Sequence, residues 1–368
     1  MMHINWVGYY NKYEGYGRFS ASIVEALQRA GVSVSATYCG DVDRPDWMWQ
    51  QLGVDWSQLT ISCMPPYLLE RIPGERHWLY TMTEGSEIPH QWAELINYAE
   101  VDRILTPCEA NAITFRQALP QIPITVLHGG TDPKPFPLKY GTFPLRTVDE
   151  NHIYTFLTIA DRASRKGWME TWKAFYKAFG PWTKGIQNVR LIVKCRAEGN
   201  DDVTGLAKAT NKDPRIIFWE EDVIDMASVY SCADVVVLPS RFEGWGMPHR
   251  ESAMMGIPTI VQKHSGLDDG HTEEWAIVTE SNPAEPISSD DLTVLAGNWH
   301  KANIDELAAW MFDCFARPDW AVERAFSGAQ WLRENQTWDH TAARLLQLIA
   351  EYERTTTTPN AVPIVTGG

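Results

Sequence analysis

The sequence lacks the features that would place the protein in a membrane or outside the cell. No stretch approaches the roughly 18 consecutive apolar residues that a membrane-spanning helix requires. The N-terminal residues carry no basic region followed by an apolar run, so we expect no signal peptide. The six cysteines include no Cys-x-x-Cys pair and no Cys/His cluster. We therefore expect a cytoplasmic protein whose thiols are reduced and mostly buried.

Positive charge is also scarce, because 32 Lys and Arg residues stand against 47 Asp and Glu residues, for a formal net charge of -15. We expect no broad surface for nucleic acid or anionic lipid, although a local basic pocket for phosphate is compatible with this balance. Hydrophobic residues make up 44% and charged residues 21% of the 368 positions, which is typical of soluble globular proteins. The length indicates two domains.

Strand-like and helix-like segments alternate along the first half of the chain. Such alternation predicts a parallel, doubly wound sheet. The expected strands cover 3–10, 32–39, 76–82, 102–108 and 124–130, and the expected helices cover 19–31, 90–100 and 111–119.

The alternation restarts after a segment at 133–150 that has four prolines and no periodicity. Strands are then expected at 153–160, 189–195, 215–219, 234–240 and 257–262, and helices at 168–179, 226–233, 247–255, 304–316 and 320–334.

The two similar halves predict an α/β fold with two Rossmann-like domains that face a deep interdomain cleft, where ligands bind at the carboxyl ends of strands. We divide the chain into an N-terminal domain at 1–136, a linker at 137–150 and a C-terminal domain at 151–335. A helix at about 336–354 is expected to pack back onto the first domain, and a disordered tail is expected at 355–368.

The segment 234–262 has the most specific pattern in the chain. A buried strand is followed by a glycine-containing turn, and a helix then begins near Pro248 and ends at Gly256. Because Gly244 and Gly246 have no Cβ, the turn can approach a ligand closely. The unpaired amides at the start of the helix then favour a diphosphate.

Two glutamates, Glu243 and Glu251, belong to this segment and have seven residues between them. Since carboxylates repel a bare diphosphate, both are expected to accept hydrogen bonds from the hydroxyls of a sugar and a ribose. Such a pair is common by chance in acidic proteins. It becomes specific only together with the strand, turn and helix around it.

The segment resembles the Glu-x7-Glu signature of the retaining glycosyltransferases of family 4, which have the GT-B fold. The resemblance implies that Glu243 contacts the donor sugar and Glu251 the nucleotide ribose. It extends to 80–115 and to 128–136, which are similar to the family's N-terminal domain and interdomain element. Four residues of the turn would then lie near the sugar and the phosphates, namely Gly244, Trp245, Gly246 and Met247.

Three cations follow the predicted strand at 153–160, and Arg162, Arg165 and Lys166 can there neutralise a diphosphate leaving group, as a metal does in other transferases. The family pattern of an arginine followed by Lys-Gly matches at Lys166-Gly167, whereas the choice between Arg162 and Arg165 stays open. The alternative is a solvated helix start, although cations are mildly unfavourable at a helix N-terminus.

Glu84 departs from the family pattern, because many members have a histidine near the donor sugar at the corresponding place. The resemblance implies that Glu84 takes over this functional place. It also implies that Gly15-Tyr16-Gly17-Arg18 opens the first helix towards the cleft and contacts the phosphate or the acceptor, with a simple loop-to-helix turn as the alternative. The nucleotide base is expected near the loop Trp219-Glu220-Glu221-Asp222, after the strand at 215–219.

Asp41-Val42-Asp43 matches the Asp-x-Asp metal motif of the other large glycosyltransferase fold, GT-A. An Arg44-Pro45 turn follows it, and the patterns elsewhere in the chain are those of GT-B. We therefore expect no metal site.

Together these features imply a transferase that moves a hexose from a UDP- or GDP-sugar to a saccharide or another hydroxyl acceptor. Retention of configuration is implied by the resemblance, and no metal or other cofactor is expected. The sugar, the base, the acceptor and a homo-oligomer stay open. Alternatives on the same scaffold are a phosphorylase, a nucleotide-sugar epimerase and a nucleic-acid-modifying glycosyltransferase, and a non-catalytic nucleotide-sugar-binding protein is an alternative of another class.

Overall fold

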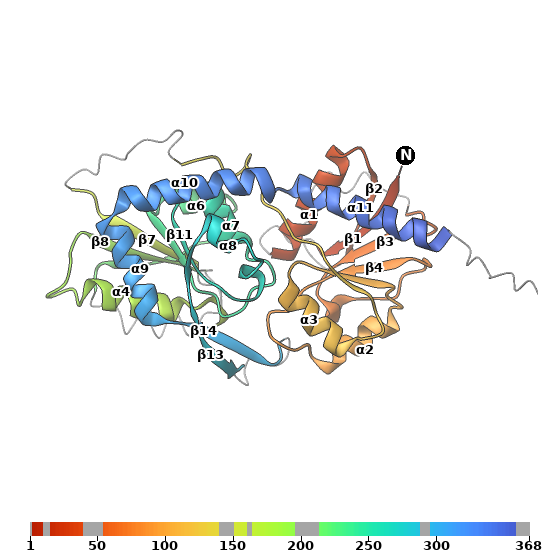
Figure 1. The fold of residues 1–368 in the computed structure, drawn as a ribbon, viewed down its shortest axis with the longest axis horizontal. Helices are drawn as coiled ribbons and strands as arrows, with labels where there is room; N and C mark the ends of the chain where they lie inside the picture. The colour runs from red at the N-terminus through yellow and green to blue at the C-terminus, as the bar shows by residue number, and fades with distance from the viewer. Residues whose placement is uncertain are drawn as a thin grey trace, which may run out of the picture.

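The computed structural model describes residues 2–9, 15–39, 54–139, 151–159, 164–195, 213–287 and 295–357. They form two α/β halves that lie side by side, and two long helices run one after the other along one edge of both halves (Figure 1). These helices are α10 (Pro318–Asn335) and α11 (Trp338–Thr357).

The N-terminal half contains a parallel sheet of six strands in the order β2-β1-β3-β4-β5-β6. The strands are β1 (His3–Tyr9), β2 (Ser33–Cys39), β3 (Thr60–Cys63), β4 (His77–Tyr80), β5 (Arg103–Thr106) and β6 (Ile124–Val126). The helices are α1 (Gly15–Arg29), α2 (His90–Tyr98) and α3 (Glu109–Ala118), and the short 3-10 helix η2 (Pro66–Leu68) follows β3.

The C-terminal half repeats this design in the order β12-β11-β10-β7-β8-β9, again parallel throughout. The strands are β7 (Tyr154–Ile159), β8 (Val189–Cys195), β9 (Ile216–Glu220), β10 (Val235–Leu238), β11 (Thr259–Gln262) and β12 (Ile277–Thr279). The helices are α4 (Trp168–Phe179), α6 (Met226–Ser231), α7 (Met247–Met254), α8 (Thr272–Trp275) and α9 (Ile304–Ala316), and the 3-10 helices are η3 (Ser164–Lys166) and η4 (Ser265–Leu267).

The predicted doubly wound fold with two Rossmann-like halves is confirmed by these two sheets. The sequence patterns missed β3, β12 and the antiparallel pair β13 (Ser281–Pro286) and β14 (Asn298–Ala302). All four residues of β3 are buried, so the alternation of polar and apolar residues that marks a half-exposed strand is absent there. Helix α1 begins at Gly15 and not at residue 19.

Helix α11 belongs to the C-terminal end of the chain but packs on α1 of the N-terminal half. Its Trp338, Leu345 and Ile349 are buried in the same hydrophobic cluster as Phe19 and Ile23 of α1. The helix continues to Thr357, past the expected end at about 354, and residues 358–368 of the expected tail lie outside the described residues. No described helix is both long and apolar enough to cross a membrane.

Candidate active site

A cavity of about 450 Å³ lies between the two halves. It opens where parallel strands of both sheets end, which is the usual ligand position in open α/β sheets. The N-terminal half contributes Gly15, Tyr16, Arg18, Phe19, Pro65, Tyr67, Met82, Glu84 and Trp92. The C-terminal half contributes Ile159, Arg165, Lys166, Lys194, Cys195, Asp222, Val223, Met226, Glu243, Gly244, Trp245, Gly246, Met247, Pro248 and Leu295.

The turn between β10 and α7 brings Glu243 and the glycines into this cavity, as the sequence predicts. At Gly244 a Cβ atom would lie 2.3 Å from the Met82 sulfur, so the two halves approach each other here at a distance that only glycine allows. The Glu243 amide donates to Ser265 Oγ at 2.8 Å, and the Glu243 carbonyl accepts from the Gly266 amide at 2.9 Å. Both backbone groups of Glu243 are therefore fixed by hydrogen bonds to η4.

The Glu243 carboxylate lies beside the two cations of η3. Its Oε1 is 2.7 Å from Lys166 Nζ and 3.2 Å from Arg165 Nη1. Burial by itself would raise the pKa of the Glu243 carboxyl, but Lys166 and Arg165 outweigh burial and hold that pKa far below its usual range. Glu243 is thus a buried, ionised acceptor.

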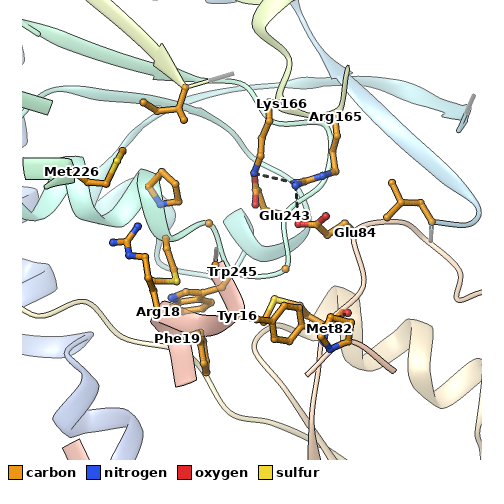
Figure 2. A pocket seen from close by; sticks show the side chains of 18 of the residues that line it. Tyr16, Arg18, Phe19, Met82, Glu84, Arg165, Lys166, Met226, Glu243 and Trp245 are labelled. Carbon is orange, nitrogen blue, oxygen red and sulfur yellow. Dashed lines mark hydrogen bonds and ion pairs between the residues drawn. The ribbon is translucent and has the colours of Figure 1, made fainter. Parts of the chain in front are cut away.

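Arg165 connects this cluster to the N-terminal half, because its Nη2 lies 2.8 Å from Glu84 Oε1. Figure 2 shows Glu84, Arg165, Lys166 and Glu243 gathered at one end of the cavity. Residues from two domains therefore form one alternating row of charges. Arg162, the other candidate for the phosphate-binding arginine, lies outside the described residues.

Glu251 has different partners, although it is also buried. Its Oε2 accepts a hydrogen bond of 2.9 Å from the Tyr230 hydroxyl, and its Oε1 is paired with Arg18 of α1. Arg18 belongs to the N-terminal half, so this contact joins the two halves. Arg18 itself lines the cavity on the opposite side from Glu84 (Figure 2).

The described lining of the cavity does not include the predicted binding residues Gly17, Trp219, Glu220 and Glu251. Gly17 is on the buried face of α1. Trp219 and Glu220 are the last two residues of β9, and the predicted loop reaches the cavity at its final residue, Asp222, which Val223 follows.

The predicted residue Tyr16 does line the cavity, but its hydroxyl group bonds to the protein itself. It donates to the Met82 carbonyl at 3.2 Å and accepts from the Met82 amide at 2.9 Å. Desolvation raises the pKa of Tyr16, so the phenol stays protonated. Tyr16 therefore shapes the wall of the cavity.

A sequence profile described as "Family 4 Glycosyltransferase in conflict systems" matches residues 128–345, which is more than half of the chain. The chain belongs to family 4 of the glycosyltransferases. No curated protein sequence matches it. The predicted family is thus confirmed, although the profile does not cover the first 127 residues of the transferase.

Solved structures agree with this assignment at the level of the fold. Sucrose-phosphate synthase from Thermosynechococcus elongatus matches with a TM-score of 0.71 and 14% identity over 96% of the transferase and 100% of that chain. HepE from Anabaena, in complex with UDP and glucose, matches with a TM-score of 0.64 and 12% identity over 95% of the transferase and 100% of the HepE chain. The trehalose-6-phosphate synthase OtsA matches with a TM-score of 0.66 and 10% identity over 95% and 99%. At these identities the likeness shows the GT-B fold.

One charged residue of the transferase's cavity, Lys194, was not predicted. Arg18, by contrast, belongs to the predicted opening of the first helix and lines the cavity. Lys194 is near the carboxyl end of β8, and its Nζ donates to the Cys195 carbonyl at 2.8 Å. A lysine directly after the buried apolar residues 191–193 of this strand was the available signal.

Among the described residues no group of three or more His, Cys, Asp or Glu side chains is arranged to hold a metal ion. Asp41 and Asp43, the alternative metal motif, lie outside the described residues. Independence of a metal therefore stays a prediction.

Proposed function

We propose that this family 4 glycosyltransferase transfers a hexose from a UDP- or GDP-sugar to a hydroxyl group of a saccharide or another small acceptor, with retention of configuration and without a metal. The observation that carries the proposal is the cluster of Glu243, Lys166 and Arg165 in the interdomain cavity. The complexes of the structural relative HepE with UDP, with UDP-glucose, and with UDP and glucose support a nucleotide-sugar donor.

The charges of the cluster suit the departure of a diphosphate. As the bond between the anomeric carbon and the phosphate oxygen breaks, negative charge develops on the leaving group, and Lys166 and Arg165 stabilise it. The acceptor oxygen forms the new bond on the same face of the sugar and gives its proton to the departing phosphate. Glu243 accepts hydrogen bonds from donor-sugar hydroxyls and supports the cationic character of the sugar.

Glu251 is proposed to bind the ribose of the donor. With Arg18 in place, only 2% of the Glu251 side chain is exposed. Ribose binding therefore requires Arg18 to move away from the carboxylate. Closure of the two halves around the donor would exclude water and limit its hydrolysis.

The test is a thermal-shift screen against UDP-, GDP- and ADP-sugars, followed by product assays on an acceptor panel. A ligand at 100 times its dissociation constant stabilises the folded state by about 2.7 kcal/mol, so the matching donor should raise the melting temperature clearly. Stabilisation by none of these donors would contradict the proposal. Stabilisation without turnover on any acceptor would favour a non-catalytic binding protein.

A further inference from the structure

The antiparallel pair β13–β14 lies at the edge of the molecule away from α10 and α11 (Figure 1). It belongs to the C-terminal half, but residues 295–299 at its second strand contact 84–87 of the N-terminal half. The two halves are therefore connected on both sides of the cavity, by α10 and α11 on one side and by this contact on the other.

Three hydrogen bonds join the two segments. The Trp299 indole N–H donates to the Glu84 carbonyl at 2.8 Å, and the Asn298 amide donates to Ser86 Oγ at 2.9 Å. The Glu87 amide donates to the Ala296 carbonyl at 3.2 Å. The segment around Glu84 is thus bound through its backbone to the opposite domain.

The contact is also closely packed. A Cβ atom on Gly85 would lie 2.2 Å from the Ala296 carbonyl oxygen, and one on Gly297 would lie 2.3 Å from Ser86 Oγ. Such approaches leave room only for glycine on both sides. The two segments therefore form a closely packed, specific interdomain contact.

The Trp299 ring also packs beside the segment that carries Glu243. Its ring is 2% exposed and shares a buried cluster with Phe242, Ile287 and Leu295. Phe242 directly precedes Glu243, and Leu295 lines the cavity. One side chain therefore contacts both chain segments that carry the carboxylates around Arg165.

We propose that Trp299 is a positioning residue for the transfer reaction, which holds the Glu84 segment against Arg165 and thereby fixes the row Glu84–Arg165–Glu243 in the closed cavity. The proposal rests on the function proposed for this site. A carbonyl held by an N–H group cannot shift freely, and misplacement of a substrate-contacting group by about 1 Å can cost on the order of 100-fold in rate.

The direct test is Trp299→Phe, which keeps a ring in the buried cluster but removes the indole donor. The matched control is Trp182→Phe, because Trp182 is 37% exposed and is not among the described residues that line the cavity. We expect Trp299→Phe to lower kcat about tenfold with UDP affinity changed less than twofold, while the control keeps the parental kcat.

A double-mutant cycle with Glu84→Gln separates positioning from general loss of stability. If Trp299 acts through Glu84, Trp299→Phe should change kcat less than twofold in the Glu84→Gln background. Full multiplication of the two losses would overturn the proposal, as would parental kcat in Trp299→Phe. Ser86→Ala removes another hydrogen bond of the same contact, on the side of the N-terminal half, and should give the same non-additive pattern. It therefore provides the test if the Trp299 variant folds poorly.

Amide hydrogen exchange measures the stability of this contact in the absence of substrate. The Glu87 amide should exchange at least tenfold faster in Trp299→Phe than in the parent or in Trp182→Phe, because its bond to Ala296 depends on the contact. Unchanged protection of this amide would overturn the proposal. A parent protein that turns over no nucleotide sugar would instead contradict the proposed function, and the exchange result would still stand.

Discussion

At the scale of single residues, Glu243 and Glu251 have the same side chain but different partners. Glu243 lies between two cations of its own domain, whereas Glu251 accepts from Tyr230 and is paired with Arg18 of the other domain. Replacement of the two carboxylates should therefore impair different steps, namely turnover for Glu243 and nucleotide binding for Glu251.

Glu243→Gln keeps the shape of the side chain and exchanges a charged acceptor for a neutral amide. Because it weakens positioning and support of the cationic sugar, we expect turnover to fall roughly 100-fold. Affinity for the bare nucleoside diphosphate should barely change, since the proposed contact is with the sugar. Steady-state kinetics and calorimetry with UDP measure the two effects. Near-normal turnover combined with lost nucleotide affinity would show that the roles are exchanged.

Glu251→Ala should do the opposite and weaken nucleotide binding. Loss of a hydrogen bond between a carboxylate and the ribose hydroxyls costs about 1.5–3 kcal/mol. Calorimetry with UDP measures this loss, and Glu243→Gln is the matched control at the other end of the cavity. Unchanged affinity for UDP would rule out the ribose role.

At the scale of elements, we expect the cations of η3 to do the work that a metal does in other transferases. Lys166→Ala removes one of the cations beside Glu243, so we expect turnover to fall on the order of 100-fold. The loss of stability should be small compared with the loss of turnover, because Arg165 remains 3.2 Å from Glu243 and still compensates its charge. A variant that unfolds at much lower temperature and keeps its turnover would assign Lys166 a structural role.

Activity in excess EDTA tests the same element from another side. If the cations of η3 stabilise the leaving diphosphate, turnover should persist in the chelator. An enzyme that loses activity in EDTA and recovers it with manganese would contradict this expectation. Asp41 and Asp43 would then become the first candidates for metal ligands.

At the scale of the whole molecule, the pH dependence of stability should reflect His249, a buried histidine of α7. His249 Nε2 lies 3.1 Å from the Leu238 carbonyl, and its Nδ1 is buried without a partner among the described residues. Burial, together with the charges of Lys166 and Arg250, lowers the pKa of His249 to about 4 against the attraction of Glu243. The imidazole is therefore neutral in the folded protein.

Because this folded pKa is below the ordinary value of 6.5, the unfolded chain binds the proton more readily, and stability is lost as pH falls from about 6.5 towards 4. We expect this histidine to cost on the order of 2 kcal/mol of unfolding free energy between pH 7 and pH 5. Denaturant unfolding at the two pH values measures it. His249→Asn should flatten the dependence, and an equally steep slope in that variant would contradict the assignment.

The sequence by itself determined the doubly wound fold, the turn that carries Glu243, and the cationic segment at Lys166. Each depends on neighbours along the chain, since strand and helix periods and glycine positions are local patterns. Lys166 and Glu243 could be assigned to one cavity because the carboxyl ends of parallel strands meet at one edge of a sheet.

Only the tertiary structure decided how the two halves meet. Arg18 and Glu251 are 233 positions apart, and Glu84 and Trp299 are 215 positions apart. Periodicity describes which face of an element is apolar, but it does not encode the angle and distance between two separately folded sheets. Three contacts depend on that docking: the ion pair of Arg18 with Glu251, the row from Glu84 to Glu243, and the hydrogen bond from Trp299 to Glu84. Each requires groups of both halves at hydrogen-bond distance.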